Sequence, residues 1–297
     1  MLEAVSYGLL TLSTIMFGFM FFFNDIFRKN YGSGIRATFV MNFGGGIVGL
    51  IALFLISGLK FEFSVFALIM AIITALNGFL FTFCSFKALG KINLSLYSLF
   101  SMLGGMALPF VSGILFHQEG ITIGKIVCFI IITIALCLTV EKGDKKKGGI
   151  YYAGIFITNG MSGVISAFYH ELDFEKISSA GYSVLCALVT ITLSGIMLLF
   201  LKGNGEKISL PCIFAMAGHG VLGRVANWLL LVALVNLPAS AQYPFVTGGT
   251  IIVSTVISAF GDKKPNKKEI LAVVLAFIGV VVLVMLPDKE IYKIIWR

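Results

Sequence analysis

The sequence predicts an all-α integral membrane protein built from ten transmembrane helices arranged as two inverted five-helix repeats. Three observations support this prediction: an apolar composition, ten apolar stretches of membrane-spanning length, and one constant offset that aligns the two halves of the chain. Of 297 residues, 58% are hydrophobic and 12% are charged, and the mean hydropathy is +1.01. Soluble domains are about half apolar and about a quarter charged, so the composition indicates a polytopic membrane protein.

The ten apolar stretches each have the length of a membrane span. A bilayer core about 30 Å thick is crossed by about 20 apolar residues in an α-helix, and unpaired backbone groups in lipid favour the helix over other structures. The stretches are residues 5–24, 37–57, 64–89, 94–117, 121–140, 150–170, 178–201, 209–234, 239–260 and 269–286. No basic residue precedes the first stretch and no small-residue cleavage site follows it, so we expect a retained helix rather than a signal peptide.

The two halves of the chain align without a gap at an offset of 145 residues. This offset pairs Gly18 with Gly163 and Gly78 with Gly223. The further matches are Tyr7 with Tyr152, Met16 with Met161, Phe23 with Phe168, Gly58 with Gly203, Ser64 with Ser209, Ala88-Leu89 with Ala233-Leu234, Ser95 with Ser240, Phe100 with Phe245, Gly104 with Gly249 and Val111 with Val256. We therefore predict a first repeat over residues 1–140, a polar linker over 141–149, and a second repeat with a short tail over 150–297.

The connecting loops carry the charge pattern of an inverted duplication. Because five is an odd number, the second repeat enters the membrane upside down relative to the first. The loop after the first stretch carries Arg28, Lys29 and Arg36, whereas its copy over 171–176 is acidic with one lysine. Connections after odd-numbered stretches hold 15 Lys and Arg, and those after even-numbered stretches, with the tail, hold 6. The positive-inside rule then places the odd-numbered connections in the cytoplasm and both termini outside.

The composition gives no sign of a cofactor, a metal or a nucleic-acid partner. The basic residues lie in short connections, which suits membrane topology rather than nucleic-acid binding. All five cysteines lie inside apolar stretches without metal-ligand spacing, so we expect small buried hydrophobes. The glycine runs at 44–46 and 104–105 lack the Lys-Ser/Thr of a phosphate-binding loop, and close helix contact is the expected role.

The chain resembles the drug/metabolite transporter superfamily, in its EamA-type form with two repeated five-helix domains. The resemblance covers the whole chain, and it depends on the glycines at 18 and 163 and on Leu108-Pro109-Phe110 in the fourth stretch. The sequence at 116–119 before Ile123-Gly124 and the sequence at 278–281 are also similar to the family. The resemblance implies a ten-helix transporter. It also implies cytoplasmic termini, contrary to the loop charges.

The strongest candidate site is a charged segment inside the eighth stretch. Arg224 lies near its middle, where an arginine costs about 2.5 to 3.5 kcal/mol on insertion scales and normally faces a cavity or a partner. Asn227 and Trp228 follow by three and four residues, so we expect all three side chains on one helix face. A guanidinium beside an amide and an indole could bind a carboxylate and stack against a planar group. The alternative is that Arg224 is held by backbone carbonyls and only locks helix packing.

Other candidate wall residues are polar or aromatic and lie away from the ends of their stretches. Inverted repeats usually bind substrate near the midplane at their interface, so we predict substrate-binding roles for Asn77, Tyr97, Gln242 and Tyr243. Tyr97 and Gln242 occupy equivalent positions and are expected on opposite sides of a central cavity. His219 is a candidate for proton coupling, although a hydrogen-bonded histidine within the bundle is the commoner case, and we expect it to point away from Arg224.

These observations predict a secondary transporter for a small anionic or zwitterionic metabolite, an exporter or exchanger. All 14 carboxylates lie at the ends of stretches or in connections, which argues against a proton-coupled cation exporter. A membrane-embedded enzyme on lipid-linked substrates and a non-transporting scaffold are the alternatives. The three histidines are spread over three stretches, so no metal or acid cluster supports an enzyme. We expect a monomer or homodimer in the bacterial plasma membrane, with a small-molecule substrate and the lipid bilayer as its partners.

Overall fold

The computed structural model describes residues 2–57, 61–92, 94–116, 122–139, 149–172, 174–202, 207–237, 239–260 and 265–286. Within these ranges the chain folds into ten α-helices. They are α1 (Leu2–Tyr31), α2 (Ile35–Ser57), α3 (Val65–Leu89), α4 (Leu94–Phe116), α5 (Ile123–Thr139), α6 (Gly149–Glu171), α7 (Ser179–Phe200), α8 (Leu210–Ala233), α9 (Ala239–Ala259) and α10 (Lys267–Met285). Nine of the predicted stretches agree with these bounds to within two residues.

The exception is α1, which continues seven residues past its predicted end. The predicted connection begins at Asp25, but Asp25 lies within the helix and pairs with Arg28 at 2.7 Å and with Lys29 at 3.1 Å. Ion pairs three and four residues apart stabilise a helix, and cations near its C-terminus suit the helix dipole. The helix ends where Gly32 adopts φ 108°, a left-handed conformation that terminates helices. Charged residues alone therefore did not mark the end of the helix.

Serine residues precede three of the helices. Ser64 accepts a hydrogen bond from the backbone N–H of Ala67 at the start of α3, and Ser178 accepts one from Gly181 at the start of α7. Ser209 precedes α8, with Pro211 in the first turn. Such caps satisfy backbone N–H groups that have no partner within the helix, so the first helical residue follows directly from the local sequence.

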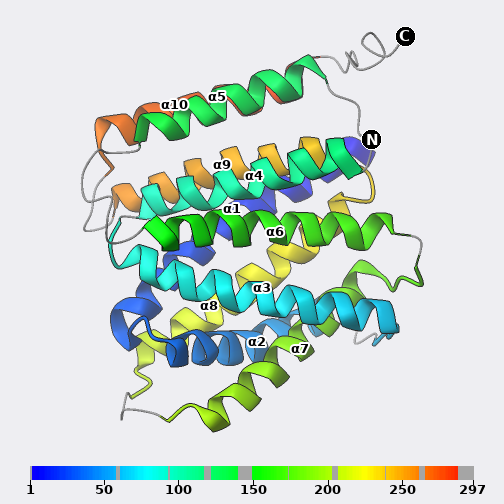
Figure 1. Cartoon of the computed structure of the whole chain (residues 1–297), viewed down its shortest axis with the longest axis vertical. Helices are drawn as coiled ribbons and strands as arrows, with labels where there is room; N and C mark the ends of the chain where they lie inside the picture. Colours follow the sequence, from blue (N-terminus) through cyan, green and yellow to red (C-terminus); the bar gives the residue numbers. More distant parts are fainter. Residues whose placement is uncertain are drawn as a thin grey trace.

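Three pairs of equivalent helices of the two predicted repeats pack against each other: α5 with α10, α4 with α9, and α2 with α7. In Figure 1 the first two pairs lie at one end of the molecule and α2 with α7 at the other, with α1, α6, α3 and α8 between them. The main contacts join α1 to α8 and α9, α3 to α6 and α7, α4 to α6, and α2 to α8, and they also join the members of the pairs α2–α7, α4–α9 and α5–α10. Most of the packing therefore occurs between the halves rather than within them.

Glycines set the closest crossings between helices, as the sequence predicts. A Cβ on Gly220 in α8 would lie 2.6 Å from the carbonyl carbon of Gly45 in α2, and one on Gly49 would lie 2.6 Å from the carbonyl oxygen of Gly220. At the crossing of α4 with α6, a Cβ on Gly104 would lie 2.7 Å from the Cα of Phe156. Small residues let helix backbones approach this closely in membranes, where packing replaces the hydrophobic effect as the force between helices.

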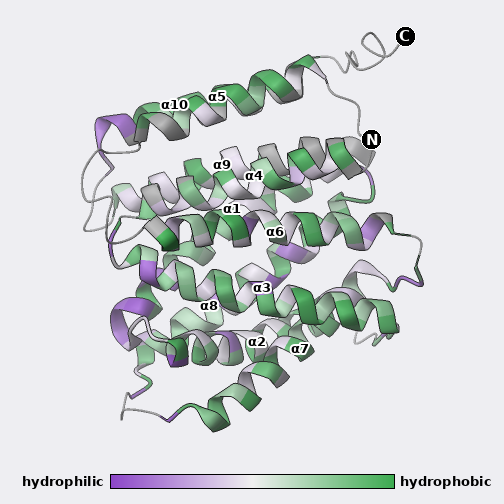
Figure 2. Ribbon diagram, in the orientation of Figure 1, coloured by the Kyte–Doolittle hydropathy of each residue, from purple (hydrophilic) through white to green (hydrophobic). Residues whose placement is uncertain are grey.

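The outer surface of the bundle is apolar, as expected for helices that contact lipid (Figure 2). Hydrophobic residues cover most of the helix lengths, and hydrophilic residues concentrate at many of the helix ends. Large side chains such as Leu55, Leu199 and Phe260 are more than four-fifths exposed. In the described part of the chain, α1, α2, α3, α7 and α8 are long and apolar enough to cross a membrane. These features are consistent with an all-α membrane protein. Of the predicted linker over 141–149, residues 141–148 lie outside the described residues and Gly149 begins α6.

Candidate functional site

A cavity of about 220 Å³ lies at the centre of the bundle. In the described part of the chain, residues from eight helices form its wall, and none of the described residues of α5 and α10 does. The lining residues are Phe17, Met20 and Phe21 of α1, Asn42, Gly45 and Gly46 of α2, Thr74, Ala75, Gly78, Phe81 and Thr82 of α3, Met102 and Gly105 of α4, Asn159, Ser162, Gly163 and Ser166 of α6, Ser183, Cys186 and Thr190 of α7, His219, Gly220, Gly223, Arg224, Asn227 and Leu230 of α8, and Val246 and Thr247 of α9.

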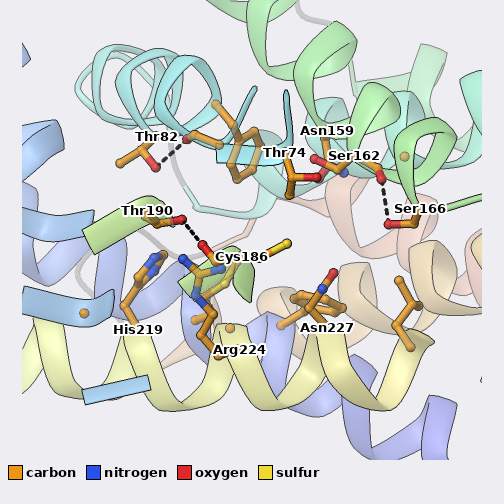
Figure 3. Close-up of a pocket in the computed structure, with 18 of the residues that line it drawn as sticks. Thr74, Thr82, Asn159, Ser162, Ser166, Cys186, Thr190, His219, Arg224 and Asn227 are labelled. Atoms are coloured by element: carbon orange, nitrogen blue, oxygen red, sulfur yellow. Dashed lines mark hydrogen bonds between the residues drawn. The ribbon is translucent and has the colours of Figure 1, made fainter. Parts of the chain in front are cut away.

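Arg224 extends from α8 into this cavity, toward Cys186 and Thr190 of α7 (Figure 3). The stem of its side chain passes α2 at Gly49, where a Cβ would lie 2.6 Å from the Arg224 Cγ. Among the residues that the structure describes, no carboxylate lies within ion-pair distance of the guanidinium, and the ion pairs there join Asp25 to Arg28 and Lys29. The cavity therefore contains a cation whose charge no described side chain neutralises.

His219 lies beside Arg224 and faces the same cavity (Figure 3), whereas we expected it to point elsewhere. The reason is the glycine spacing of α2. Gly45 and Gly49 lie one turn apart, and a Cβ on Gly45 would lie 3.4 Å from the His219 ring. The missing side chains on α2 leave room for both His219 and Arg224 to reach the cavity. The Nδ1 atom of His219 is buried without a hydrogen-bond partner in the structure.

The other two predicted residues of α8 lie in different environments. Asn227 lines the cavity with Arg224. Trp228 does not line it and packs against the cluster of Leu53, Val184 and Ala187. Three residues along a helix turn the side chain about 60° one way, and four residues turn it about 40° the other way. The wall of the cavity passes between these two directions, which separates Trp228 from the site.

Two further predicted residues, Asn77 and Tyr97, lie near the cavity but not in its lining. Asn77 donates hydrogen bonds to the Thr158 carbonyl and the Ser162 hydroxyl, both at 2.8 Å, and so joins α3 to α6 directly behind the wall. Tyr97 is fully buried, 2.7 Å from the Ser85 hydroxyl. We expected it to face Gln242 across the cavity.

Gln242 and Tyr243 in α9 complete the predicted set. Gln242 is fully buried and donates to the Leu230 carbonyl at 2.8 Å, while its Oε1 atom has no partner in the structure. It ties α9 to α8 and does not line the cavity. The side chain of Tyr243 lies outside the described residues, so its predicted role remains a prediction.

The cavity also contains polar residues that the sequence did not single out. Asn42 of α2, Asn159 and Ser162 of α6, and Thr190 of α7 line it together with Arg224. In Figure 3, Asn159 and Ser162 lie across the cavity from the residues of α8. Single serines, threonines and asparagines are common in membrane helices, and helices that are apolar on every face give no periodic signal of the inward side. The repeat offset would have identified a further lining residue, because Thr82 is equivalent to the predicted Asn227.

The cavity has one apolar wall and one polar wall. Phe17, Met20 and Phe21 of α1, with Phe81 of α3, form an aromatic and thioether surface. Helices α6, α7 and α8 supply hydroxyl, amide and guanidinium groups instead. This arrangement could hold a small solute that has an apolar part and a polar, negatively charged part. Ligand sites commonly combine a mostly apolar wall with a few placed polar groups.

Two buried clusters pack at opposite ends of α3 and α8. The first end cluster joins the end of α3 to the start of α8, and it contains Phe27, Tyr31, Ala37, Val40, Met41, Phe86, Cys212, Ala215 and Met216. The second end cluster joins the start of α3 to the end of α8, and it contains Ala67, Met70, Ala71, Ile165, Tyr169, Tyr182, Leu185, Cys186 and Leu231. In the second, Tyr169 and Tyr182 stack at 3.8 Å, and the Tyr182 hydroxyl lies 3.0 Å from that of Thr74. Apolar packing thus flanks the cavity at both ends.

Comparison with known proteins identifies a shared fold. The structure matches 28 solved chains. One of them, described only as the crystal structure of a protein, superposes with a TM-score of 0.66 and 15% sequence identity, and the match covers 97% of this chain and 98% of that chain. At this identity the match concerns the fold alone. No family model matches the chain, and no curated protein matches it. In the described residues, no group of three His, Cys, Asp or Glu side chains could hold a metal ion.

Proposed function

We propose that this protein is a secondary transporter that moves a small anionic or zwitterionic metabolite by alternating access between two inverted five-helix halves. The halves are residues 1–140 and 150–297, as predicted from the repeat. The observation on which the proposal depends is Arg224, a cation without a described counter-charge, in a cavity that lies between the halves. In this proposal all ten helices cross the membrane, and the family is the drug/metabolite transporter superfamily that the sequence resembles.

The lining of the cavity supports the two-fold relation between the halves. Eight pairs of lining residues are separated by the repeat offset of 145. They are Phe17 and Ser162, Phe21 and Ser166, Gly45 and Thr190, Thr74 and His219, Ala75 and Gly220, Gly78 and Gly223, Thr82 and Asn227, and Met102 and Thr247. A cavity formed by equivalent positions of two repeats lies on the axis that relates them. Binding sites of inverted-repeat transporters occupy this position.

Contacts between equivalent residues support the same axis. Thr247 donates a hydrogen bond to the carbonyl of Met102, its own equivalent, at 3.2 Å. A Cβ on Gly46 would lie 2.8 Å from Ile191, again its own equivalent. Two residues related by a two-fold axis can touch only where the axis passes between them. The helix contacts agree, since α1–α8 corresponds to α6–α3 and α2–α8 corresponds to α7–α3.

The two end clusters supply the seals that alternating access requires. Seven positions of the first end cluster have their equivalents in the second end cluster: 37, 40, 41, 86, 212, 215 and 216 with 182, 185, 186, 231, 67, 70 and 71. Opening one seal while keeping the other exposes the cavity to one side of the membrane at a time. Because the repeats are related by symmetry, exchanging their conformations exchanges the open side.

The size and charge of the cavity define the solute class. A volume of about 220 Å³ is below the roughly 300 to 1,000 Å³ of pockets for drug-sized ligands, so the solute is a small metabolite. A guanidinium binds carboxylates through paired hydrogen bonds. The absence of a described intramembrane carboxylate near Arg224 disfavours cationic solutes, since nothing in the described wall would balance their charge.

Substitution of Arg224 tests the proposal. Purified protein in detergent would be screened by thermal shift against amino acids, organic acids, nucleosides and cationic drugs, because binding raises apparent stability by mass action. We expect carboxylate-bearing hits whose affinity falls at least about 30-fold in Arg224→Gln, as for the loss of about 2 kcal/mol or more from a buried charged contact. Arg224→Lys keeps the positive charge but loses the planar guanidinium with its paired donors. Its affinity for the same ligands should lie between that of the parent protein and that of Arg224→Gln. Arg36→Gln, at a helix end outside the cavity, is the matched control.

The same variant separates binding from a packing role. Removing a cation that has no partner relieves a desolvation cost, so ligand-free Arg224→Gln should be at least as stable as the parent protein. A large loss of ligand-free stability would instead mean that Arg224 locks the helices together. Counterflow of a hit in proteoliposomes then tests transport itself. A panel without carboxylate hits, or hits confined to organic cations, would contradict the proposal.

A further inference from the structure

Most hydroxyl groups in the described cavity lining donate their hydrogen atom to an acceptor within the protein. Seven lining residues carry a hydroxyl, and six of these donate to a backbone carbonyl oxygen. Ser162, Ser166, Ser183, Thr82 and Thr190 each donate to the carbonyl four residues earlier, at 2.7 to 3.1 Å, and Thr247 donates to Met102. The seventh, Thr74, lies 3.0 Å from the Tyr182 hydroxyl, and either of these two hydroxyls can donate. A hydroxyl has one hydrogen and two lone pairs, so these groups offer the cavity acceptors.

Two amides of the lining, on α2 and α6, also donate hydrogen bonds within the protein. The Asn42 amide nitrogen donates to the Thr38 carbonyl at 2.8 Å and to the Thr82 hydroxyl at 3.2 Å, which uses both of its hydrogens. The Asn159 amide nitrogen donates to the Ser101 carbonyl at 2.8 Å. Both residues line the cavity. Their carbonyl oxygens therefore add two further acceptors on α2 and α6.

The strong donors of the cavity are concentrated on α8. A guanidinium carries five N–H donors and no acceptor, and Arg224 makes no ion pair with a described residue. Asn227 lies one turn along the same wall. The cavity thus has its one described guanidinium on α8, where Asn227 and His219 can each donate or accept, and it has mostly acceptors on α2, α3, α6 and α7. A ligand that satisfies both sides must itself carry acceptors at one place and donors at another.

From this division we infer that the transported solute is a zwitterion, with a carboxylate held by Arg224 and an ammonium group held by the acceptors of α2, α6 and α7. An ammonium has three donors and no acceptor, which suits a wall whose hydroxyl hydrogens are already used. A plain carboxylate would occupy Arg224 but leave the acceptor side without a donor. This inference rests on the proposed function and narrows its solute class from anionic or zwitterionic to zwitterionic.

Four solutes with one six-carbon chain test the inference directly. They are norleucine, 6-aminohexanoate, hexanoate and hexylamine, measured by titration calorimetry on the purified full-length protein. Their alkyl chains suit the apolar wall of Phe17, Phe21 and Phe81. We expect norleucine or 6-aminohexanoate to bind about tenfold or more tightly than hexanoate, the factor that one hydrogen bond to a charged group supplies. Which of the two binds more tightly shows how far the ammonium site lies from Arg224.

A substitution in the acceptor wall links this preference to the structure. Thr190→Val removes an acceptor without changing the shape of the side chain, and it should lower the affinity ratio of the zwitterion to hexanoate several-fold. Thr190→Ser should retain the ratio. Thr133→Val is the matched control, because Thr133 donates to the Phe129 carbonyl at 2.7 Å in the same way and lies in α5, outside the cavity.

The outcomes separate this inference from the proposed function. Equal binding of hexanoate and the zwitterions, lost in Arg224→Gln, would overturn the inference and leave the anion transporter intact. Tight binding of hexylamine that is unaffected by Arg224→Gln would overturn both. If none of the four solutes binds at millimolar concentrations, the inference is wrong for this chain length and the proposed function is judged on the wider panel. An unchanged ratio in Thr190→Val would also count against the acceptor wall.

Discussion

The crossing of α2 with α8 gives the sharpest test of the packing that forms the cavity. Gly220→Ala places a Cβ within 2.6 Å of the Gly45 carbonyl carbon and 2.8 Å of its Cα. Ordinary contact between carbon atoms is about 3.5 to 4.0 Å, so the helices must separate by about 1 Å. Both obstructing atoms are backbone and cannot rotate away. Overpacking of this kind costs about 1 to 3 kcal/mol, and we expect a value near the upper limit.

The assay is equilibrium unfolding in mixed micelles of a mild detergent and sodium dodecyl sulfate. Gly78→Ala is the matched control, because it is the same substitution within a helix and nothing lies within 4 Å of the added Cβ. In a helix interior this change should stabilise the protein by about 0.5 to 1 kcal/mol. If Gly220→Ala unfolds at the same detergent fraction as the parent protein, the close approach of α2 and α8 is wrong.

Three further predictions concern a helix end, a loop contact and a buried amide. Gly32→Ala should lower the free energy of unfolding by about 1 to 2 kcal/mol, because φ 108° is unfavourable for a residue with a Cβ. Circular dichroism should show fraying at the C-terminal end of α1, and an unchanged unfolding midpoint would contradict the left-handed end of this helix. Glu62→Gln should destabilise the start of α7 by about 0.5 to 1 kcal/mol, because the Glu62 carboxylate accepts hydrogen bonds from both the backbone N–H and the hydroxyl of Ser178. The expected signal is faster hydrogen exchange over the first turn of α7. Exchange at the rate of the parent protein would refute this role of Glu62. Asn24→Leu should raise the melting temperature, because the side-chain nitrogen and oxygen of Asn24 are both buried without hydrogen-bond partners in the structure. A clear fall in the melting temperature would show that Asn24 has a partner in another state of the protein.

Helix positions could be predicted because they depend on local properties of the chain. Apolar stretches of sufficient length must be helical in lipid, and Ser64 and Ser178 cap the helices that follow them. Arg224 also stood out, since an ionisable side chain within an apolar stretch is rare. The predicted end of α1 was wrong because the charged residues there stabilise the helix instead of ending it.

The composition of the candidate site depended on helix packing. The alignment of the repeats paired Gly78 with Gly223, but nothing in the chain alone indicated that Asn42, Asn159 and Thr190 face the same cavity. Trp228 was predicted in the site because it lies one turn from Arg224, yet a difference of about 100° around the helix separates it from Asn227. An apolar helix in a membrane has no polar face to reveal its inward side.

The sequence by itself determined the positions of the helices and an ionisable residue, Arg224, inside an apolar stretch, and it predicts a duplication at an offset of 145 residues. Only the tertiary structure decided what surrounds that cation. The glycines of α2 admit His219 and Arg224 to the cavity, and hydrogen bonds within the helices direct the hydroxyl hydrogens away from it. The first effect arises where α2 and α8 meet, and the second matters for the cavity because packing turns these faces of α6 and α7 inward. Local sequence specifies each helix, whereas the chemistry of the cavity is the sum of faces that come together only on packing.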